Sequence, residues 1–434
     1  MTPLMIGALG IIALFVLILL QVPIGISMLV VGVVGYAAQT GWGPALAMVA
    51  GEPSGLLASV DLATVPLFLL MGTFASAAGF STEIYNAAAA VLGHRRGGLA
   101  YATAIGSAAF GAICGSSAAT AATFTKAALP EMLSRGYSQS FAAGTIAAGG
   151  ALKSLIPPSV AMILYCIATK TFIFDLFIAA VIPALLTIAL NLLTITVVAN
   201  VSPSSAPVSE RMPWSERWPL ILRTLPVLIL MVVIFTGLYS GIFTVNEAAS
   251  VAAVLSFVFA ALRGRLTAAA IWKGMRDCAS ASAMIYTIII GSTLFGAFLT
   301  LAQVPEALIK LLEGAHLNGP VVIVLLLVIY LILGSVFDEI AAMLITLPFV
   351  LPIITQLGYD PIWWGVINVV ILEVGMIHPP LGLIGFVIHG MAPDISLRKI
   401  YRGVAPFIIA DIVVLALLVI FPALALWLPK VMPR

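Results

Sequence analysis

Apolar runs of about twenty residues recur from one end of the chain to the other, and they restrict the fold more than any other feature. Such a run is long enough to cross the hydrocarbon core of a bilayer as a helix, which pairs its own backbone groups. Of the 434 residues, 62% are hydrophobic and 8% are charged, whereas soluble domains carry about 25% charged residues. The runs also lack the alternating pattern of a membrane β-barrel. The sequence therefore predicts an all-α polytopic membrane protein.

The beginning of the chain and its cysteines exclude several other classes. The first apolar run has neither a basic start nor a cleavage site of small residues, so we expect a retained span rather than a signal peptide. Cys114, Cys166 and Cys278 are scattered and form no CxxC motif, so neither a disulfide framework nor a transition-metal site is predicted. The net charge of +2 gives no indication of nucleic-acid binding.

The chain contains an internal repeat. The segment that begins at Ala128 aligns with the segment that begins at Val350, at a constant shift of 222 residues. Dipeptides recur in register at this shift: Leu129-Pro130 on Leu351-Pro352, Gly136-Tyr137 on Gly358-Tyr359, and Pro157-Pro158 on Pro379-Pro380. The upstream segments "CGSSAATAATF" and "LGSVFDEIAAMLIT" align after a small insertion or deletion.

The basic loops indicate that the repeat is inverted. Arg95 and Arg96 have the uncharged counterpart "AHLNGP", and the basic loop from Arg263 to Arg276 has residues 41–54, which contain no Lys or Arg, as its counterpart. Because cytoplasmic loops collect Lys and Arg, matched loops of opposite bias belong on opposite faces of the membrane. Both termini are then predicted to be periplasmic.

Each half is predicted to contain five transmembrane spans and one re-entrant hairpin. The first inverted repeat covers residues 1–200, a polar cytoplasmic linker covers 201–218, and the second repeat covers 219–434. The predicted hairpins are 98–134 and 319–357, the broken helices are 139–168 and 360–391, the other spans are 4–21, 22–40, 62–80, 173–200, 219–240, 244–262, 282–303 and 404–428, and the amphipathic surface helices are 41–54 and 266–280.

The broken helices are the first candidates for function. The pairs Pro157-Pro158 and Pro379-Pro380 remove backbone donors, so carbonyl oxygens in 151–156 and 372–378 are expected to be exposed. Inverted repeats with interrupted helices are typical of secondary transporters, which bind substrate and ions near the midplane of the bilayer. An isolated proline often only kinks a membrane helix, but two pairs at equivalent positions favour a binding site.

The two hairpin tips are the candidate Na⁺ sites. At the first tip, Gly115 permits a tight turn, and Ser116 and Ser117 offer hydroxyl and carbonyl oxygens. The alternative is that these small residues only allow close helix packing. The second tip repeats this pattern with Gly334 and Ser335, and it adds a carboxylate at Asp338. Asp338 would either bind an ion or lie solvated at the water interface.

Charged residues at the breaks are the candidate substrate ligands. Lys153 lies four residues and Glu373 six residues before the first proline of its pair. Lys153 would meet an anionic substrate or occupy a cation site; the alternative is a structural ion pair or a lysine that reaches the interface. Ser154, Ser117 and His378 complete this predicted set, although a single histidine is more often a structural residue. Glu339 is expected to be solvated.

At these residues the chain resembles a known family. The stretches "AFGAICGSSAATAATF", "LIPPSVAMILYCI", "GIFTVNEAASVAAV" and "GYDPIWWGVINVVILEVGMIHPPLGL" resemble the large membrane subunit of tripartite ATP-independent periplasmic (TRAP) transporters. The resemblance covers both halves. It implies an elevator-type transporter with a scaffold and a transport domain, in the bacterial inner membrane, that imports an organic acid on a Na⁺ gradient. It further implies a periplasmic binding protein and a small four-helix membrane subunit, here expected as a separate chain.

By position, the resemblance implies one ion site at Gly115, Ser116 and Ser117 with the 151–156 loop. The second site would be Gly334, Ser335 and Asp338 with the 372–378 loop.

The chain also departs from the family pattern. Lys153 stands where a small or apolar residue is common, His378 where threonine is usual, and Glu339 where proline is frequent. One hypothesis is that the Lys153 ammonium replaces a bound cation or pairs with a second substrate carboxylate. If so, the usual number of Na⁺ ions is in doubt.

Three other classes compete with this interpretation. A stand-alone ion-coupled di- or tricarboxylate carrier would need no binding protein. An intramembrane enzyme would need a catalytic motif, and HExxH, GxSxG and a P-loop are absent from the sequence. A channel fits paired broken helices poorly. We therefore expect a transporter subunit that is not an enzyme, needs no cofactor besides Na⁺ as coupling ion, contacts membrane lipid and does not bind nucleic acid.

Overall fold

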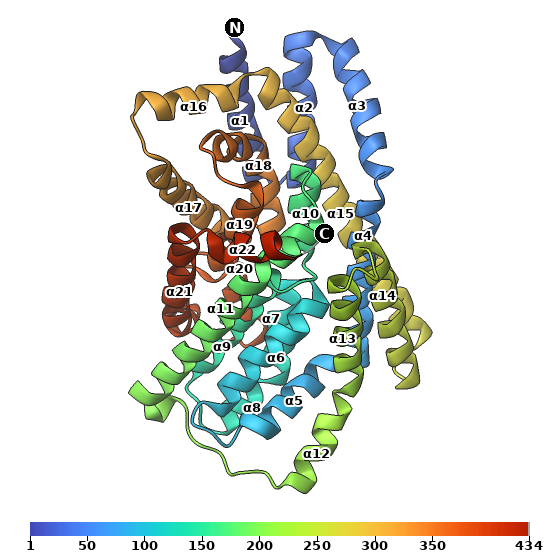
Figure 1. Ribbon diagram of the computed structural model, residues 1–434, viewed down its shortest axis with the longest axis vertical. Coiled ribbons are helices and arrows are strands. Elements are labelled where there is room, and N and C mark those ends of the chain that lie inside the picture. The colour runs from blue at the N-terminus through green and yellow to red at the C-terminus, as the bar shows by residue number, and fades with distance from the viewer. Residues whose placement is uncertain (433–434) are drawn as a thin grey trace.

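The computed structural model describes residues 1–432, and every regular element in that range is helical (Figure 1). Eight of its helices are long and apolar enough to cross a membrane, or nine if the bent pair α12 (Trp214–Arg223) and α13 (Leu225–Tyr239) is counted as one span. The prediction of an all-α polytopic membrane protein is thereby confirmed.

The first half of the chain contains eleven α-helices and one 3₁₀ turn. They are α1 (Pro3–Leu19), α2 (Ile24–Thr40), α3 (Trp42–Leu57), α4 (Val60–Ala78), α5 (Phe80–Leu92), α6 (Gly98–Cys114), α7 (Ser117–Ala127), α8 (Leu129–Ser134), α9 (Gln139–Ala151), η1 (Leu152–Leu155), α10 (Val160–Thr169) and α11 (Ile173–Val201).

The described remainder of the chain starts with a largely non-helical linker and continues into the helices of the second half. Its elements are η2 (Pro203–Ser205), α12 (Trp214–Arg223), α13 (Leu225–Tyr239), α14 (Val245–Leu262), α15 (Ala268–Leu301), α16 (Val304–Gly314), α17 (Gly319–Val336), α18 (Glu339–Gln356), α19 (Pro361–Ile377), α20 (Leu383–Met391), α21 (Leu397–Ile420) and α22 (Ala423–Val431).

An outer group of helices is formed by α1 to α4 and α13 to α15, in which α2 packs along α15 and α4 along α14. Glycines allow the backbones of α2 and α15 to touch. A Cβ atom at Gly25 would lie 2.8 Å from the Ile288 nitrogen, and one at Gly32 would lie 2.7 Å from the Phe295 nitrogen. Small residues commonly permit such close helix packing in membranes.

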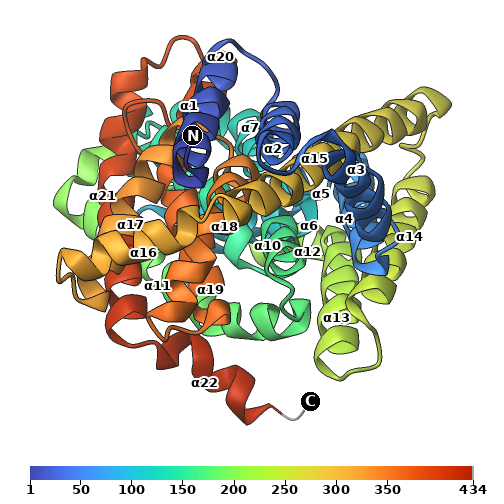
Figure 2. The same ribbon diagram turned by 90° about the horizontal axis from the view of Figure 1, so that it is seen from above.

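The remaining long helices form a second group around the two breaks. Helices α6 and α7 pack on α9, helices α17 and α18 pack on α19, and α9 packs along α21. Seen from above, α13 and α14 lie on one side of the molecule, α17 and α21 lie on the other, and α10 and α18 lie between them (Figure 2). Segments from both halves of the chain therefore meet at the centre.

Several predicted boundaries differ from the structure. The predicted surface helix 266–280 is only the first part of α15, whose 34 residues extend over about 51 Å. Helix α3 folds back beside α2 and α15 rather than lying across the end of the molecule. The helix that does lie across that end in Figure 1 is α16, which was not predicted.

Two predicted spans are also interrupted. The span 219–240 is bent by 47° between α12 and α13. The span 404–428 ends at Ile420, and a separate helix, α22, follows it. A proline occurs at both positions: Pro226 in the first turn of α13 and Pro422 just before α22. Proline lacks the backbone donor that a continuous helix requires there.

Candidate ion and substrate site

The first break lies where α9 changes into the 3₁₀ turn η1 and the chain then restarts as α10. Pro157 and Pro158 lie in this gap, and Ser159 caps α10 by accepting a hydrogen bond from the Met162 nitrogen at 3.5 Å. Lys153 is on η1, and only 1% of its side chain is exposed. The break therefore positions an ammonium group inside the protein.

A buried network joins this break to the second half of the chain. The Lys153 ammonium donates to the Gly115 carbonyl at 2.9 Å and to a Glu339 carboxylate oxygen at 2.9 Å. Ser154 donates through its hydroxyl to the other Glu339 oxygen at 2.7 Å and through its backbone N–H to Glu373 at 2.5 Å. Glu339 is 6% exposed and Glu373 is 5% exposed. Three ionisable groups thus share one buried site.

This network is stabilising only as a unit. Removing water from two charges is expensive, and their attraction offsets that cost when further hydrogen bonds satisfy the remaining donors and acceptors. Here the Gly115 carbonyl and the Ser154 hydroxyl supply those bonds. Loss of one partner would leave a buried charge without compensation.

The predicted residues of the first tip lie beside this network. Gly115 separates α6 from α7 with a left-handed φ of 71°, and Ser116 caps α7 by accepting from the Ala119 nitrogen at 3.3 Å. Ser117 is buried, with its hydroxyl 3.5 Å from that of Ser154. The structure brings together five predicted residues: Gly115, Ser117, Lys153, Ser154 and Glu373.

The second tip is built differently. Gly334 and Ser335 lie within the last turn of α17, where the Ser335 hydroxyl donates to the Ile332 carbonyl at 2.8 Å. The Ser335 carbonyl accepts from the Gly382 nitrogen at 3.1 Å. Helix α19 continues to Ile377, so most of the predicted open loop 372–378 is helical, and the break is confined to the residues that follow.

The two acidic residues of the second tip have opposite environments. Asp338 is exposed and caps α18, accepting from the Ile340 nitrogen at 3.0 Å. Glu339 is the first residue of α18 and points into the network, so the prediction that Glu339 is solvated is wrong. Asp338 precedes α18 in an extended conformation and Glu339 lies in its first turn, so the two carboxylates point into different surroundings.

His378 lies apart from the Lys153 network. It is the C-cap residue of α19, it is half-buried, and its Nδ1 atom contacts the carbonyl of Pro379. Within residues 1–432, no hydrogen bond joins His378 to Lys153, Glu339 or Glu373. Pro379 and Pro380 occupy the gap between α19 and α20, as Pro157 and Pro158 occupy the first gap.

Comparison with known proteins identifies the family. The profile of the family described as "Tripartite ATP-independent periplasmic transporter, DctM component" matches residues 11–424. The chain belongs to this family. The resemblance noted from the sequence motifs is thereby confirmed.

Individual TRAP permeases match over most of the chain. The C4-dicarboxylate TRAP transporter large permease protein DctM of Pseudomonas aeruginosa is 35% identical over 370 residues, which cover 85% of this chain and 86% of that protein. The sialic acid TRAP transporter large permease protein SiaM of Vibrio cholerae is 29% identical and covers 86% and 88% of the two chains. The isethionate permease DctMQ of Oleidesulfovibrio alaskensis is 30% identical, and 85% of this chain matches 58% of that longer protein.

The crystal structure of the Alcanivorax borkumensis YdaH transporter has a similar fold. It matches with a TM-score of 0.61 over 89% of each chain at 15% identity. At that identity the likeness extends to the fold alone. The family match identifies the chain as a multi-pass membrane transporter subunit.

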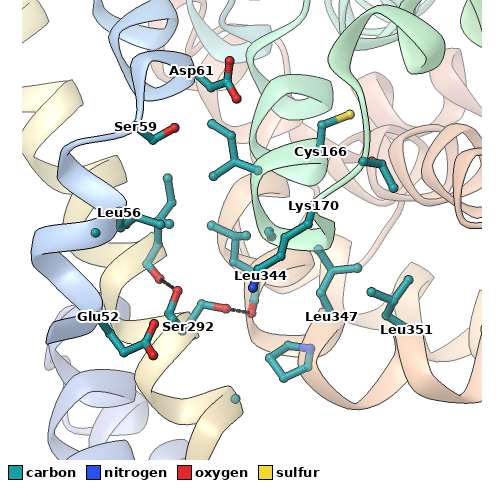
Figure 3. Close-up of a pocket in the computed structure, with 18 of the residues that line it drawn as sticks. Glu52, Leu56, Ser59, Asp61, Cys166, Lys170, Ser292, Leu344, Leu347 and Leu351 are labelled. Carbon is teal, nitrogen blue, oxygen red and sulfur yellow. Dashed lines mark hydrogen bonds between the residues drawn. The ribbon is translucent and has the colours of Figure 1, made fainter. Parts of the chain in front are cut away.

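A cavity of this TRAP-family permease lies away from the charged network. Its volume is about 840 Å³, and it lies between α3, the start of α4, the end of α10, α15 and α18 (Figure 3). Glu52, Asp61 and Lys170 line it, whereas none of the predicted site residues does. In Figure 3 the Lys170 side chain extends into the space beside Leu344.

Lys170 is therefore a candidate that sequence reasoning missed. It caps α10 with a left-handed φ of 56°. The ten residues of that helix separate it from the first break by about 15 Å. One signal was available: Lys170 follows the first broken helix in a loop predicted to be periplasmic, where basic residues are disfavoured.

Proposed function

We propose that this chain is the large permease subunit of a secondary active transporter that imports an organic acid across the inner membrane. A Na⁺ gradient drives uptake, and a periplasmic binding protein delivers the substrate. A small four-helix membrane subunit, encoded as a separate chain, completes the transporter. The observation that carries this proposal is the meeting of both hairpin tips, the first helix break and helix α19, which precedes the second break, around the buried Lys153 network, in a chain of the TRAP family.

The substrate class follows from the relatives and from the cavity. Relatives of this chain are named as permeases for C4-dicarboxylates and for sialic acid, which both carry a carboxylate. Lys170 offers an ammonium group in the large cavity, and Ser59 and Thr171 add polar groups to its wall. We infer that this cavity is the route by which the carboxylate reaches the broken helices from the periplasmic side.

Coupling to Na⁺ would use the oxygen atoms of the tips. Ser116 and Ser117 are candidates at the first tip, and Gly334, Ser335 and Asp338 are candidates at the second. The Gly115 carbonyl already accepts from the Lys153 ammonium. We therefore propose that Lys153 acts as a tethered cation at the first tip, which reduces the number of free Na⁺ ions needed there.

The packing supports an elevator-type movement. The glycine-mediated contact of α2 with α15 makes the outer group a coherent scaffold. The two breaks and both hairpins would move as the transport domain, held together by the bonds of Ser154 to Glu339 and Glu373. Helix α18 contacts the scaffold helix α15, where the Ser292 hydroxyl donates to the Leu344 carbonyl at 2.6 Å.

Uptake into proteoliposomes tests this proposal. Vesicles would hold this chain and its small subunit, with the binding protein and an inward Na⁺ gradient each supplied or withheld, and labelled C4-dicarboxylate and sialic acid as probes. We expect uptake of an organic acid only when the binding protein and the Na⁺ gradient are both supplied. Uptake without the binding protein would instead favour the stand-alone carrier, and uptake indifferent to Na⁺ would refute sodium coupling.

A further inference from the structure

A groove lies at the end of the molecule where α11 runs into the linker, opposite α16 in Figure 1. Its volume is about 430 Å³, and its two walls are the segment from the end of α5 into α6 and the last part of α11. The charged side chains that line it, Arg95 and Arg96, are both basic and both exposed. Neither arginine forms an ion pair within residues 1–432. The mouth of the groove thus carries two positive charges that no described carboxylate pairs with.

The loop that carries the two arginines is fixed against α11. Gly97 has a left-handed φ of 73°, a conformation that residues with a side chain rarely adopt. A Cβ atom on Gly97 would lie 3.2 Å from the Ala199 Cβ atom, so the loop and the helix are in close contact. The Gly98 nitrogen also donates to the Arg95 carbonyl at 2.8 Å, which closes the turn. The backbone of this loop therefore holds both arginines beside the end of α11.

Farther along the groove, the walls need no polar ligand. The Thr196 hydroxyl donates to the Leu192 carbonyl at 2.8 Å, so the Tyr101 hydroxyl, 2.7 Å away, donates to Thr196. Both hydroxyl hydrogens are thereby used within the protein. Beyond these hydroxyls the walls are Leu192 on α11 and Ile105 on α6, whose side chain is exposed. This part of the groove suits a hydrocarbon chain.

The change from polar to apolar occurs at a similar depth on both walls. On α11, Leu192 and the exposed Asn200 at the mouth are about 12 Å apart along the helix axis. On α6, Ile105 is about 10 Å from Gly98, the first residue of the helix after the arginines. A ligand that fills the groove must therefore combine an anionic head with an apolar tail. A phospholipid with an anionic headgroup has this character.

We propose that this groove binds one anionic phospholipid, with its phosphate at Arg95 and Arg96 and one acyl chain along Ile105 and Leu192. Basic pockets between membrane helices on the cytoplasmic side bind anionic headgroups, and the basic loops predict that this end of the molecule is cytoplasmic. A soluble phosphate would use the arginines but would leave the apolar walls uncovered. The bound headgroup joins the loop before α6 to the end of α11. This inference does not depend on the substrate or the coupling ion proposed above.

Native mass spectrometry of the full chain in detergent tests this inference, with phosphatidylglycerol and phosphatidylcholine of identical acyl chains as probes. Each basic residue near an anionic lipid contributes about a factor of five in affinity, so one phosphatidylglycerol should bind about thirtyfold more tightly than phosphatidylcholine. Glycerol phosphate, which has the charged group but no acyl chain, should not compete at equal concentration.

Three results would overturn the inference. Equal affinity for the two lipids would mean that the arginines select no headgroup. Competition by glycerol phosphate would identify a site for soluble anions. Loss of phosphatidylglycerol when the small membrane subunit is added would mean that a protein partner covers the groove.

Variants locate the bound lipid. Arg95→Gln combined with Arg96→Gln should lower the affinity for phosphatidylglycerol to that for phosphatidylcholine. Arg398→Gln combined with Arg402→Gln is the matched control, because it removes the same charge at exposed positions outside the groove and should leave the preference unchanged. Ile105→Trp keeps both arginines but fills the apolar wall, so it should weaken phosphatidylglycerol binding without lowering the unfolding temperature. A preference that survives in the groove double variant, or that both double variants lose equally, would overturn the assignment.

Discussion

The two helix breaks of this permease occupy equivalent positions in the repeat, yet their interiors differ. At the shift of 222 residues, Lys153 aligns with Gly375. In the first half, the stem of Lys153 packs against α6, where a Cβ atom at Gly111 would lie 2.3 Å from the Lys153 Cβ. In the second half, Gly375 packs against Gly334, where a Cβ atom at Gly375 would lie 2.7 Å from the Gly334 Cα. The first break thus contains a charged side chain, whereas at the equivalent position of the second break two glycine backbones pack against each other.

The difference shows that the repeat reproduces the shape of the break but not its chemistry. Both carboxylates of the network, Glu339 and Glu373, belong to the second half, whereas the ammonium belongs to the first. Both acids therefore bond to residues of the first repeat and not to the break in their own half. The result is one composite charged site rather than two equivalent sites, and each prediction below changes one side of this asymmetry.

Removing the positive charge of Lys153 should have the largest effect on stability. Lys153→Met keeps the length of the side chain but leaves Glu339 buried without a partner, which costs about 3–5 kcal/mol in the free energy of unfolding. Thermal unfolding in detergent would measure this loss. Lys126→Met, at an exposed lysine on α7, is the control and should leave stability nearly unchanged.

A double variant tests whether the stability lost in Lys153→Met comes from the broken Lys153–Glu339 ion pair or from changed packing. In Lys153→Met combined with Glu339→Gln, neither position of the former ion pair carries a charge, so much of the lost stability should return. Strictly additive losses would mean that the two groups do not interact, which would contradict the network.

The serine hydroxyls of the first break and of the second tip should differ in the same sense. Ser154→Ala removes a hydrogen bond to the Glu339 carboxylate, so we expect a loss of about 1.5–3 kcal/mol. Ser335→Ala removes only a bond to a carbonyl of its own helix and should cost about 1 kcal/mol or less. The two variants serve as each other's controls in thermal unfolding, and equal losses would argue against a special role for the first break.

The backbone contact of the second break should respond to added volume. Gly375→Ala places a methyl group against the backbone of Gly334, which cannot rotate away, so we expect a loss of about 1–3 kcal/mol. Gly390→Ala is the matched control, because nothing lies within 4 Å of its added atom. If both variants unfolded at the same temperature, α17 and α19 would not be as closely packed as the structure has them.

Much of this architecture was predictable because it depends on local chemistry. Apolar runs indicate membrane helices, and Pro157-Pro158 and Pro379-Pro380 interrupt helices wherever they occur. The burial of Glu339 was not predictable, because the choice between it and Asp338 depends on where α18 begins. A cavity of about 10 Å³ that Asn191 and Asp411 line was missed for a similar reason. Asn191 and Asp411 are 220 residues apart in the sequence and meet only through the packing of α11 and α21.

Substitutions of Asp338 should have the smallest effect on stability. They distinguish two roles for this residue at the second tip, that of a helix cap and that of an ion ligand. Asp338→Ala loses the cap of α18 and should cost about 1 kcal/mol, whereas Asp338→Asn keeps a good capping residue and should leave the unfolding temperature unchanged. If the carboxylate also binds Na⁺, Asp338→Asn should raise the Na⁺ concentration needed for half-maximal uptake in proteoliposomes. Unchanged sodium dependence in Asp338→Asn would mean that Asp338 only caps α18. Of the two hairpin tips, only the first, beside the composite site around Lys153, would then use a charged side chain in transport.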